Sequence, residues 1–162
     1  MSIRNVLKMI TNAPGCVVFP PQGIPTIDPT LELPLDVHEF YEVCGGVTLF
    51  QHADYQVNIV PPQEFVLSNP VLVGERCEED ISSNWYLVAN DGHGEYLTID
   101  LDPSRLGRCY DSFHDRHGVV GESSIIALSF TDLLERLIKN KGQYWYWLQD
   151  DFASLGDAYE EL

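Results

Sequence analysis

The sequence predicts one α+β domain spanning residues 1–162, with helices near both ends and strands between them. Two observations support this prediction. The 162 residues are 44% apolar, and a chain of this length can bury roughly two-thirds of its surface around one core. The spacing of the apolar residues also changes along the chain, from the period of a helix to that of a strand and back again.

Two helices are predicted before the strands begin. Apolar residues repeat at helical spacing within residues 2–12. Six prolines follow between positions 14 and 34, and we expect this segment to be extended with little regular structure. A second helix should begin at Pro34, because the N–H that proline lacks has no partner in a first helical turn. It should end at the pair Gly45–Gly46.

Beyond Gly46 the apolar period becomes that of a strand. The strongest hairpin signal joins residues 85–89 to residues 96–100 through a turn rich in Asp and Gly, which supply the positive φ angles of tight turns. Pro61–Phe65 predicts a helical turn, and residues 75–84 predict a loop. The predicted strands are residues 47–51, 56–60, 85–90, 95–101, 109–112 and 125–128.

A third helix is predicted over Phe130–Asn140, where Ser129 and Asp132 form a capping box. Two interpretations of the aromatic and acidic extension, residues 143–162, remain open. The aromatic block Tyr144–Trp147 is typical of a partner-binding platform. Alternatively, apolar residues at helical spacing predict a C-terminal helix packed against the domain. These residues are Tyr144, Leu148, Phe152, Leu155 and Tyr159.

The charge of the chain excludes several classes of partner. With 25 acidic and 9 Lys or Arg side chains, the net charge is −16, whereas binding to nucleic acid or to an anionic membrane needs clustered bases. No apolar run reaches the ~18 residues of a membrane span, and the N-terminal segment lacks the apolar stretch of a signal peptide. We therefore expect a cytoplasmic protein whose four cysteines are free, buried thiols.

Two patterns suggest catalysis, and neither is complete. Ser123 lies where a nucleophile elbow has its serine, but Ile125 replaces the second glycine, so we interpret the segment as a loop leading into a strand. Cys109, His114 and His117 have the donor types that zinc prefers, which leaves a small metal-dependent hydrolase as an alternative. A second ligand segment is not evident, and we expect neither a metal nor another cofactor.

Three motifs follow one another between residues 30 and 140. They are Leu33–Pro34 through Phe40–Tyr41 to Gly45–Gly46, the Gly-rich hairpin Ala89–Glu95 with Ile99–Asp100, and the strand Ile125–Ala127 followed by Ser129–Phe130 and Leu133–Leu134. In this order they resemble the SUKH superfamily, which includes the Smi/Knr cell-wall assembly regulators and many bacterial homologues.

The resemblance implies an α+β fold, with a twisted, largely antiparallel sheet of about five or six strands and helices packed against it. It also implies a non-enzymatic protein-binding domain. Many bacterial members resemble immunity proteins, which neutralise a cognate toxin that is often a nuclease or a deaminase; a regulatory scaffold of cell-wall assembly type is the alternative. A toxin that acts on nucleic acid needs a basic cleft, to which an acidic inhibitor would be steered.

The acidic excess lies mainly in the second half of the chain. Residues 1–74 hold 7 acids and 2 bases, whereas residues 75–162 hold 18 acids and 7 bases. We therefore predict that loops of the second half contact the basic surface of a toxin domain; the alternative is that they are solvated loops without a partner. The predicted partner-binding residues are Glu78, Glu79, Asp80, Asp91, His93, Asp111, His114 and Asp115.

Overall fold

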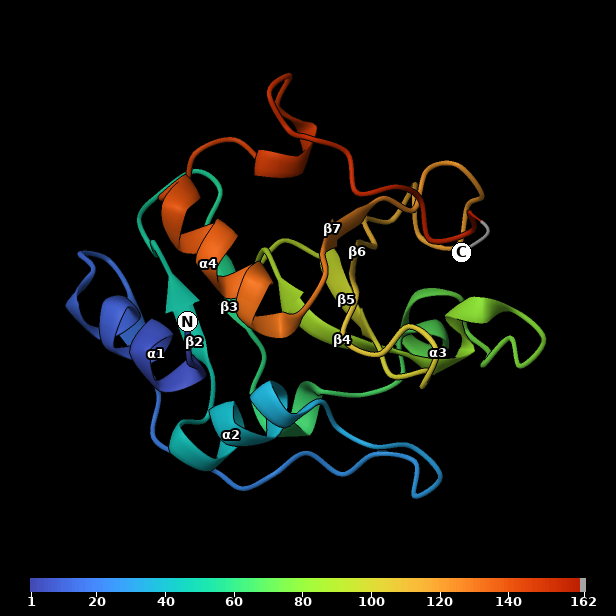
Figure 1. The fold of residues 1–162 in the computed structure, drawn as a ribbon, viewed down its shortest axis with the longest axis horizontal. Helices are drawn as coiled ribbons and strands as arrows, with labels where there is room; N and C mark the ends of the chain where they lie inside the picture. The colour runs from blue at the N-terminus through green and yellow to red at the C-terminus, as the bar shows by residue number, and fades with distance from the viewer. Residues whose placement is uncertain (161–162) are drawn as a thin grey trace.

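The computed structural model describes residues 1–160 and contains a seven-stranded antiparallel sheet in which each strand pairs with the next along the chain (Figure 1). The α+β prediction is confirmed, with slightly more strands than expected. The additional strand lies in the Pro-rich segment, where Val17 and Val18 pair with Thr48 and Val47 at the sheet edge. The strands are β1 (Val17–Val18), β2 (Val47–Leu49), β3 (Val57–Ile59), β4 (Trp85–Asn90), β5 (Tyr96–Asp100), β6 (Cys109–Asp111) and β7 (Ile125–Ala127).

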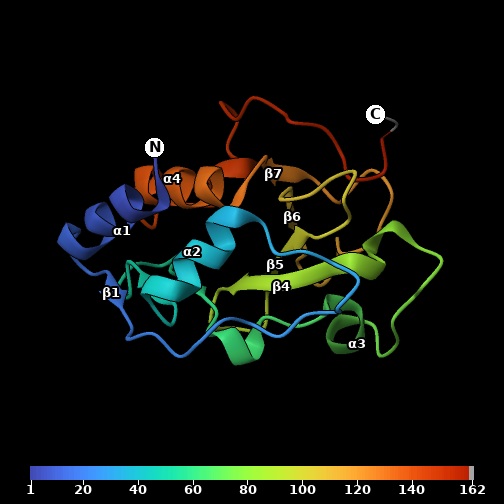
Figure 2. The same ribbon diagram turned by 60° about the horizontal axis from the view of Figure 1, so that its bottom comes forward.

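Three helices, α1 (Ile3–Asn12), α2 (Leu35–Val43) and α4 (Phe130–Asn140), pack against one another. Figure 2 shows them on one side of the sheet, with α3 (Ser68–Leu72) on the other. The main hydrophobic core lies between these three helices and the sheet. No helix within residues 1–160 is long and apolar enough to cross a membrane. Short 3-10 helices are Pro62–Glu64, as predicted, then Ile81–Asn84 within the predicted loop, and Tyr146–Leu148.

The two amphipathic helices begin where a side chain caps their first turn. Ser129 Oγ accepts a hydrogen bond from the backbone N–H of Asp132 (3.0 Å), as the capping box predicts. Ser2 Oγ likewise accepts from the N–H of Asn5 (3.2 Å) at the start of α1. The apolar stripe of each helix is buried, so both helices are confirmed.

The side of the sheet opposite α1, α2 and α4, here named the second face, carries a separate small core. Trp85, Tyr110, Ile125 and Ala158 form this core. The C-terminal tail is held here because Ile125 N donates to the carbonyl oxygen of Gly156 (2.9 Å) along the free edge of β7. Residues at the end of the chain are thereby brought onto the second face.

The predicted C-terminal helix is wrong. Apart from one 3-10 turn, Tyr146–Leu148, and an isolated β-bridge between Asp157 and Ser124, residues 141–160 are irregular. Tyr144 and Leu148, which belong to the predicted apolar stripe, are exposed, whereas Trp147 lies outside that stripe and is buried. The aromatic rings are therefore placed one by one against the domain rather than along one face of a helix.

Candidate functional site

A chain of buried and partly buried polar side chains joins α3 to the sheet across the second face. Asn69 donates through its side-chain amide to Ser82 Oγ (2.9 Å) and to a backbone carbonyl, so its Oδ1 accepts from His117 Nε2 (2.6 Å). His117 Nδ1 then accepts from Ser112 Oγ (2.9 Å), which in turn contacts Thr98 Oγ1 (2.7 Å). Each polar group in this chain has a partner, as buried polar groups require.

The order of Ser112, His117 and Asn69 is that of a nucleophile, its base and an orienting group. Ser112 is fully buried, however, so no substrate can reach its hydroxyl. Ser123, the serine of the incomplete elbow motif, is also fully buried and donates to two carbonyl oxygens of its own loop (2.9 and 3.0 Å). Both hydroxyls stabilise loops, and neither is placed for hydrolysis.

The partly buried position of His117 makes the stability of the fold depend on pH. Burial lowers the pKa of His117 from 6.5 to about 4, and the nearby charge of Asp80 offsets this only in part. Below pH 6.5 the unfolded chain gains a proton at His117 that the folded chain does not. The free energy of unfolding should therefore fall as the pH drops from about 6.5 to about 4, by at most about 3 kcal/mol, in urea titrations over this range.

A non-titrating side chain at position 117 separates this effect from the other carboxyl and imidazole groups. His117→Gln should remove this part of the pH dependence, because an amide can still donate to Asn69. His93→Gln is the matched control, since His93 is exposed, and it should leave the slope as in the wild type. The same slope in the wild type and in His117→Gln would contradict the prediction.

Loop 75–80 contains three of the predicted contact residues. Two are exposed to solvent, and the third is fixed by hydrogen bonds. Glu78 and Glu79 are exposed, whereas the carboxylate of Asp80 accepts hydrogen bonds from Ser82 N (3.0 Å) and Tyr159 OH (2.7 Å). Burial alone would raise the pKa of Asp80, but hydrogen bonds from Ser82 and Tyr159 hold it below its usual value. A hollow of about 460 Å³ lies here, and it is lined by Glu75, Cys77, Glu78, Glu79 and Asp80.

The C-terminal tail joins loop 75–80 to the loop that precedes β7. Tyr159 reaches Asp80, as described above, and two residues earlier the Oδ2 atom of Asp157 accepts from the backbone N–H of Gly121 (3.1 Å). At the right of Figure 1 the red tail meets the orange loop that contains Gly121. Segments that are distant in the sequence therefore form one continuous surface.

This surface, which we name the acidic end, has a strong excess of negative charge. Within residues 75–80, 118–122 and 155–160 there is a single base, Arg76. Its Nη2 atom is paired with Asp28 Oδ2 (3.4 Å). Nothing local in the sequence indicates that the tail returns to the second face, so these acids cannot be grouped from the sequence alone. The acids are Glu75, Glu78, Glu79, Asp80, Glu122, Asp157 and Glu160.

Four more predicted contact residues lie at the turn between β4 and β5 and in the loop after β6. Asp91 shapes the turn, because its carboxylate accepts from the backbone N–H groups of His93 (2.7 Å) and Glu95 (3.0 Å). The backbone N–H of His114 donates to Glu95 Oε1 (2.8 Å), which joins the two loops. His93, His114 and Asp115 are exposed.

The expectation that Asp111 is an exposed contact residue is wrong, because only 1% of its surface is exposed. Its carboxylate accepts from Trp147 Nε1 (3.0 Å), Arg116 Nε (2.6 Å) and Phe113 N (3.0 Å). The alternation of β6 is the signal that could have revealed this, since Asp111 lies two residues after the buried Cys109 and shares its face of the sheet. Asp111 anchors the tail and the loop after β6.

The structure does not bring the candidate zinc ligands together. Cys109 Sγ lies 3.5 Å from the carbonyl oxygen of Gly107, whereas His117 takes part in the polar chain of the second face and His114 is exposed. In the described part of the chain, no three or more His, Cys, Asp or Glu side chains are arranged to hold a metal ion. All four cysteines are free, Cys44 and Cys109 buried and Cys16 and Cys77 partly buried.

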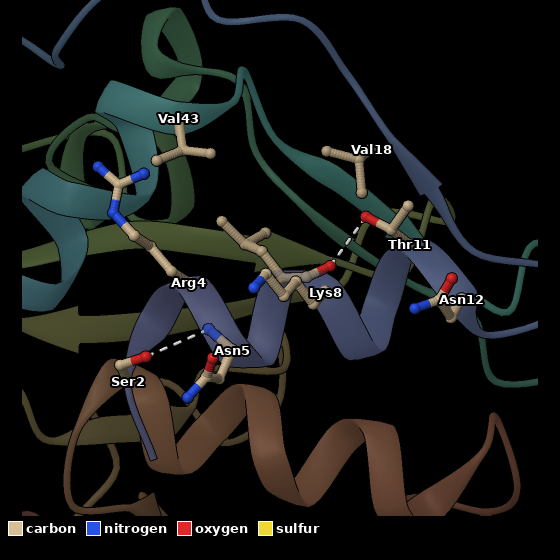
Figure 3. Close-up of a pocket in the computed structure, with 9 residues that line it drawn as sticks. Ser2, Arg4, Asn5, Lys8, Thr11, Asn12, Val18 and Val43 are labelled. Carbon is tan, nitrogen blue, oxygen red and sulfur yellow. Dashed lines mark hydrogen bonds between the residues drawn. The ribbon is translucent and has the colours of Figure 1, made fainter.

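Another hollow, of about 630 Å³, lies beside α1, next to α2 and β1. In Figure 3, Arg4 and Val43 lie at one end of it and Thr11 and Val18 at the other. Arg4 pairs with Glu39 (3.1 Å), and the walls are mainly apolar. This hollow contains none of the predicted contact residues, so we place the candidate site at the acidic end.

Comparison with known proteins agrees with the motif order found in the sequence. The model of the SMI1/KNR4 family (SUKH-1) matches residues 30–136. The chain is also 59% identical over 162 residues to the immunity protein YokJ of Bacillus subtilis (strain 168), a match that covers 100% of this chain and 98% of that protein. No solved structure matches the chain. A family model that spans most of the sheet and three helices, together with this relative, establishes that the chain belongs to the SMI1/KNR4 family (SUKH-1).

Proposed function

We propose that this chain is an immunity protein that binds a cognate toxin and neutralises it without catalysis. The observation that carries the proposal is the 59% identity to the immunity protein YokJ along the whole chain. The burial of Ser112 and Ser123, the two serines with catalytic neighbours or motifs, supports a binding rather than a hydrolytic role.

We propose that the acidic end is the surface that meets the toxin. A nuclease or deaminase holds its nucleic acid substrate with a basic cleft, and a surface with seven acids and one paired base is complementary to such a cleft. Covering the cleft would exclude the substrate. Because that substrate lies in the cytoplasm, we place the immunity protein there too.

The hairpin and the loop after β6 extend the proposed contact surface. Asp91 and His93 lie at the turn, and His114 and Asp115 follow in the loop bonded to it through Glu95. The same loop continues to His117, whose partner Asn69 donates to the carbonyl oxygen of Arg76 in loop 75–80 (3.0 Å). We assign Asp91, which is partly exposed, and the exposed His93, His114 and Asp115 to the rim of the interface, where polar contacts tune specificity.

Co-expression with the product of the gene immediately upstream tests this function. We expect the upstream protein to stop growth when it is expressed alone, and growth to return when this chain is present in at least equal amount. The two proteins should also co-purify and elute together from a sizing column, because neutralisation by binding requires a stable complex.

A toxin from an unrelated immunity pair is the matched control, and this chain should give no protection against it. The absence of both protection and complex with the upstream product would contradict the proposal. Capture of cell-wall synthesis proteins from the native cell, with no toxin bound, would instead favour the regulatory scaffold.

A further inference from the structure

An apolar pair, Val119 and Val120, is exposed on the acidic end. Val120 has 72% of its surface exposed and Val119 has 41%. Single exposed apolar side chains are common and need no explanation. This pair is different because of the way the loop holds it and because of the charges around it.

Hydrogen bonds and two glycines fix the loop that carries the pair. Gly118 and Gly121 flank it with φ angles of 71° and 84°, in the left-handed region that favours glycine. Val119 N donates to the carbonyl oxygen of Arg116 (3.2 Å), and Glu122 N donates to that of Val119 (3.0 Å). The loop is therefore ordered before any partner arrives, which lowers the entropic cost of binding.

The pair lies between two carboxylates of the acidic end. On one side, Gly118 lies close to Tyr159, whose hydroxyl donates to Asp80. A Cβ atom added to Gly118 would be 3.9 Å from that hydroxyl. On the other side, the N–H of Gly121 donates to Asp157. Glu122 follows directly in the sequence. An apolar tip flanked by carboxylates has the composition of a small interface, with an apolar centre and a polar rim.

We infer that Val119 and Val120 insert into an apolar depression within the basic cleft of the toxin, while the surrounding carboxylates pair with bases at its rim. This inference rests on the proposed function and names the chemistry of the partner surface. A nucleic acid or another anionic partner would be repelled by the rim. A purely apolar partner would leave the carboxylates without water and without a counter-charge, which is costly.

Substitutions at Val120 test this inference by binding kinetics. The full upstream gene product would be immobilised and the full-length chain passed over it. Val120→Ser should raise the dissociation rate constant about tenfold and leave the association rate constant within about twofold, because the charges that steer the encounter are unchanged. Val120→Arg should abolish detectable binding, since it places a cation in a cleft that is already basic.

Leu35→Arg is the matched control, because Leu35 is 89% exposed at the start of α2, away from the acidic end. It should bind as the wild type does. Circular dichroism and the melting temperature should be unchanged in all three variants, so that lost binding reports on the interface. Wild-type binding by Val120→Arg would overturn the inference and leave the proposed function standing. A wild-type chain that does not bind the upstream product would instead contradict the proposed function itself.

Discussion

Replacing Asp100 by Ala should lower the free energy of unfolding by about 3 to 5 kcal/mol, the largest effect expected of a single substitution here. Asp100 is fully buried in β5, and its carboxylate accepts hydrogen bonds from Trp85 Nε1 (3.1 Å), Arg105 Nε (3.0 Å) and Tyr110 OH. Burial raises the pKa of Asp100, and the hydrogen bond from Tyr110 and the charge of Arg105 oppose this rise. Alanine would leave two buried donors, Trp85 Nε1 and Tyr110 OH, without an acceptor, and would remove the buried partner of Arg105.

Two further substitutions identify the cause of the loss. Asp102→Asn should cost less than about 1 kcal/mol, because Asp102 pairs with the same Arg105 (3.3 Å) but is partly exposed. Asp100→Asn should lie between the two, since it keeps the volume and one acceptor oxygen while losing the charge. Urea unfolding followed by tryptophan fluorescence measures all three variants. A loss in Asp100→Ala no larger than that in Asp102→Asn would show that the buried carboxylate is dispensable.

The parts of the fold that the sequence predicts well are those determined by local interactions. The cap at Ser129 and the Gly-rich turn after β4 act within a few residues, so the periodicity and turn residues are sufficient to place α4 and the β4–β5 hairpin. Val17–Val18 has no such local signal. It becomes a strand only because β2 is beside it, and this pairing depends on the tertiary fold.

The same distinction separates the correct expectations from the wrong ones in the candidate site. Glu78 and Glu79 are exposed as expected, and their contact with a toxin stays a prediction. Asp80 and Asp111 are held by Tyr159 and Trp147, which are 79 and 36 residues away in the sequence. The apolar residues of the tail recur at helical spacing, so the sequence predicts a helix rather than these hydrogen bonds to Asp80 and Asp111. Aromatic side chains of the tail that bond to particular carboxylates on the domain need not recur at the spacing of a helix.

Neutralising loop 75–80 should slow association with the toxin by about tenfold or more at low ionic strength. The triple substitution Glu75→Gln, Glu78→Gln and Glu79→Gln removes three exposed charges from the acidic end. Asp80 is kept, because it accepts from Tyr159 and caps a 3-10 helix, so changing it would disturb the fold as well. The dissociation rate constant should change much less than the association rate constant, since long-range steering acts before contact.

Salt dependence and a charge-matched control distinguish steering at the acidic end from a general effect of net charge. The difference between the wild type and the triple variant should vanish as salt approaches about 1 M, where charges are screened beyond about 3 Å. Glu32→Gln, Asp54→Asn and Asp150→Asn together remove the same charge from exposed positions outside the acidic end. Stopped-flow association should be slowed far less in this control. Equal slowing in the two triple variants would mean that the whole charge of the protein, rather than the surface built by loop 75–80 and the tail, steers the toxin.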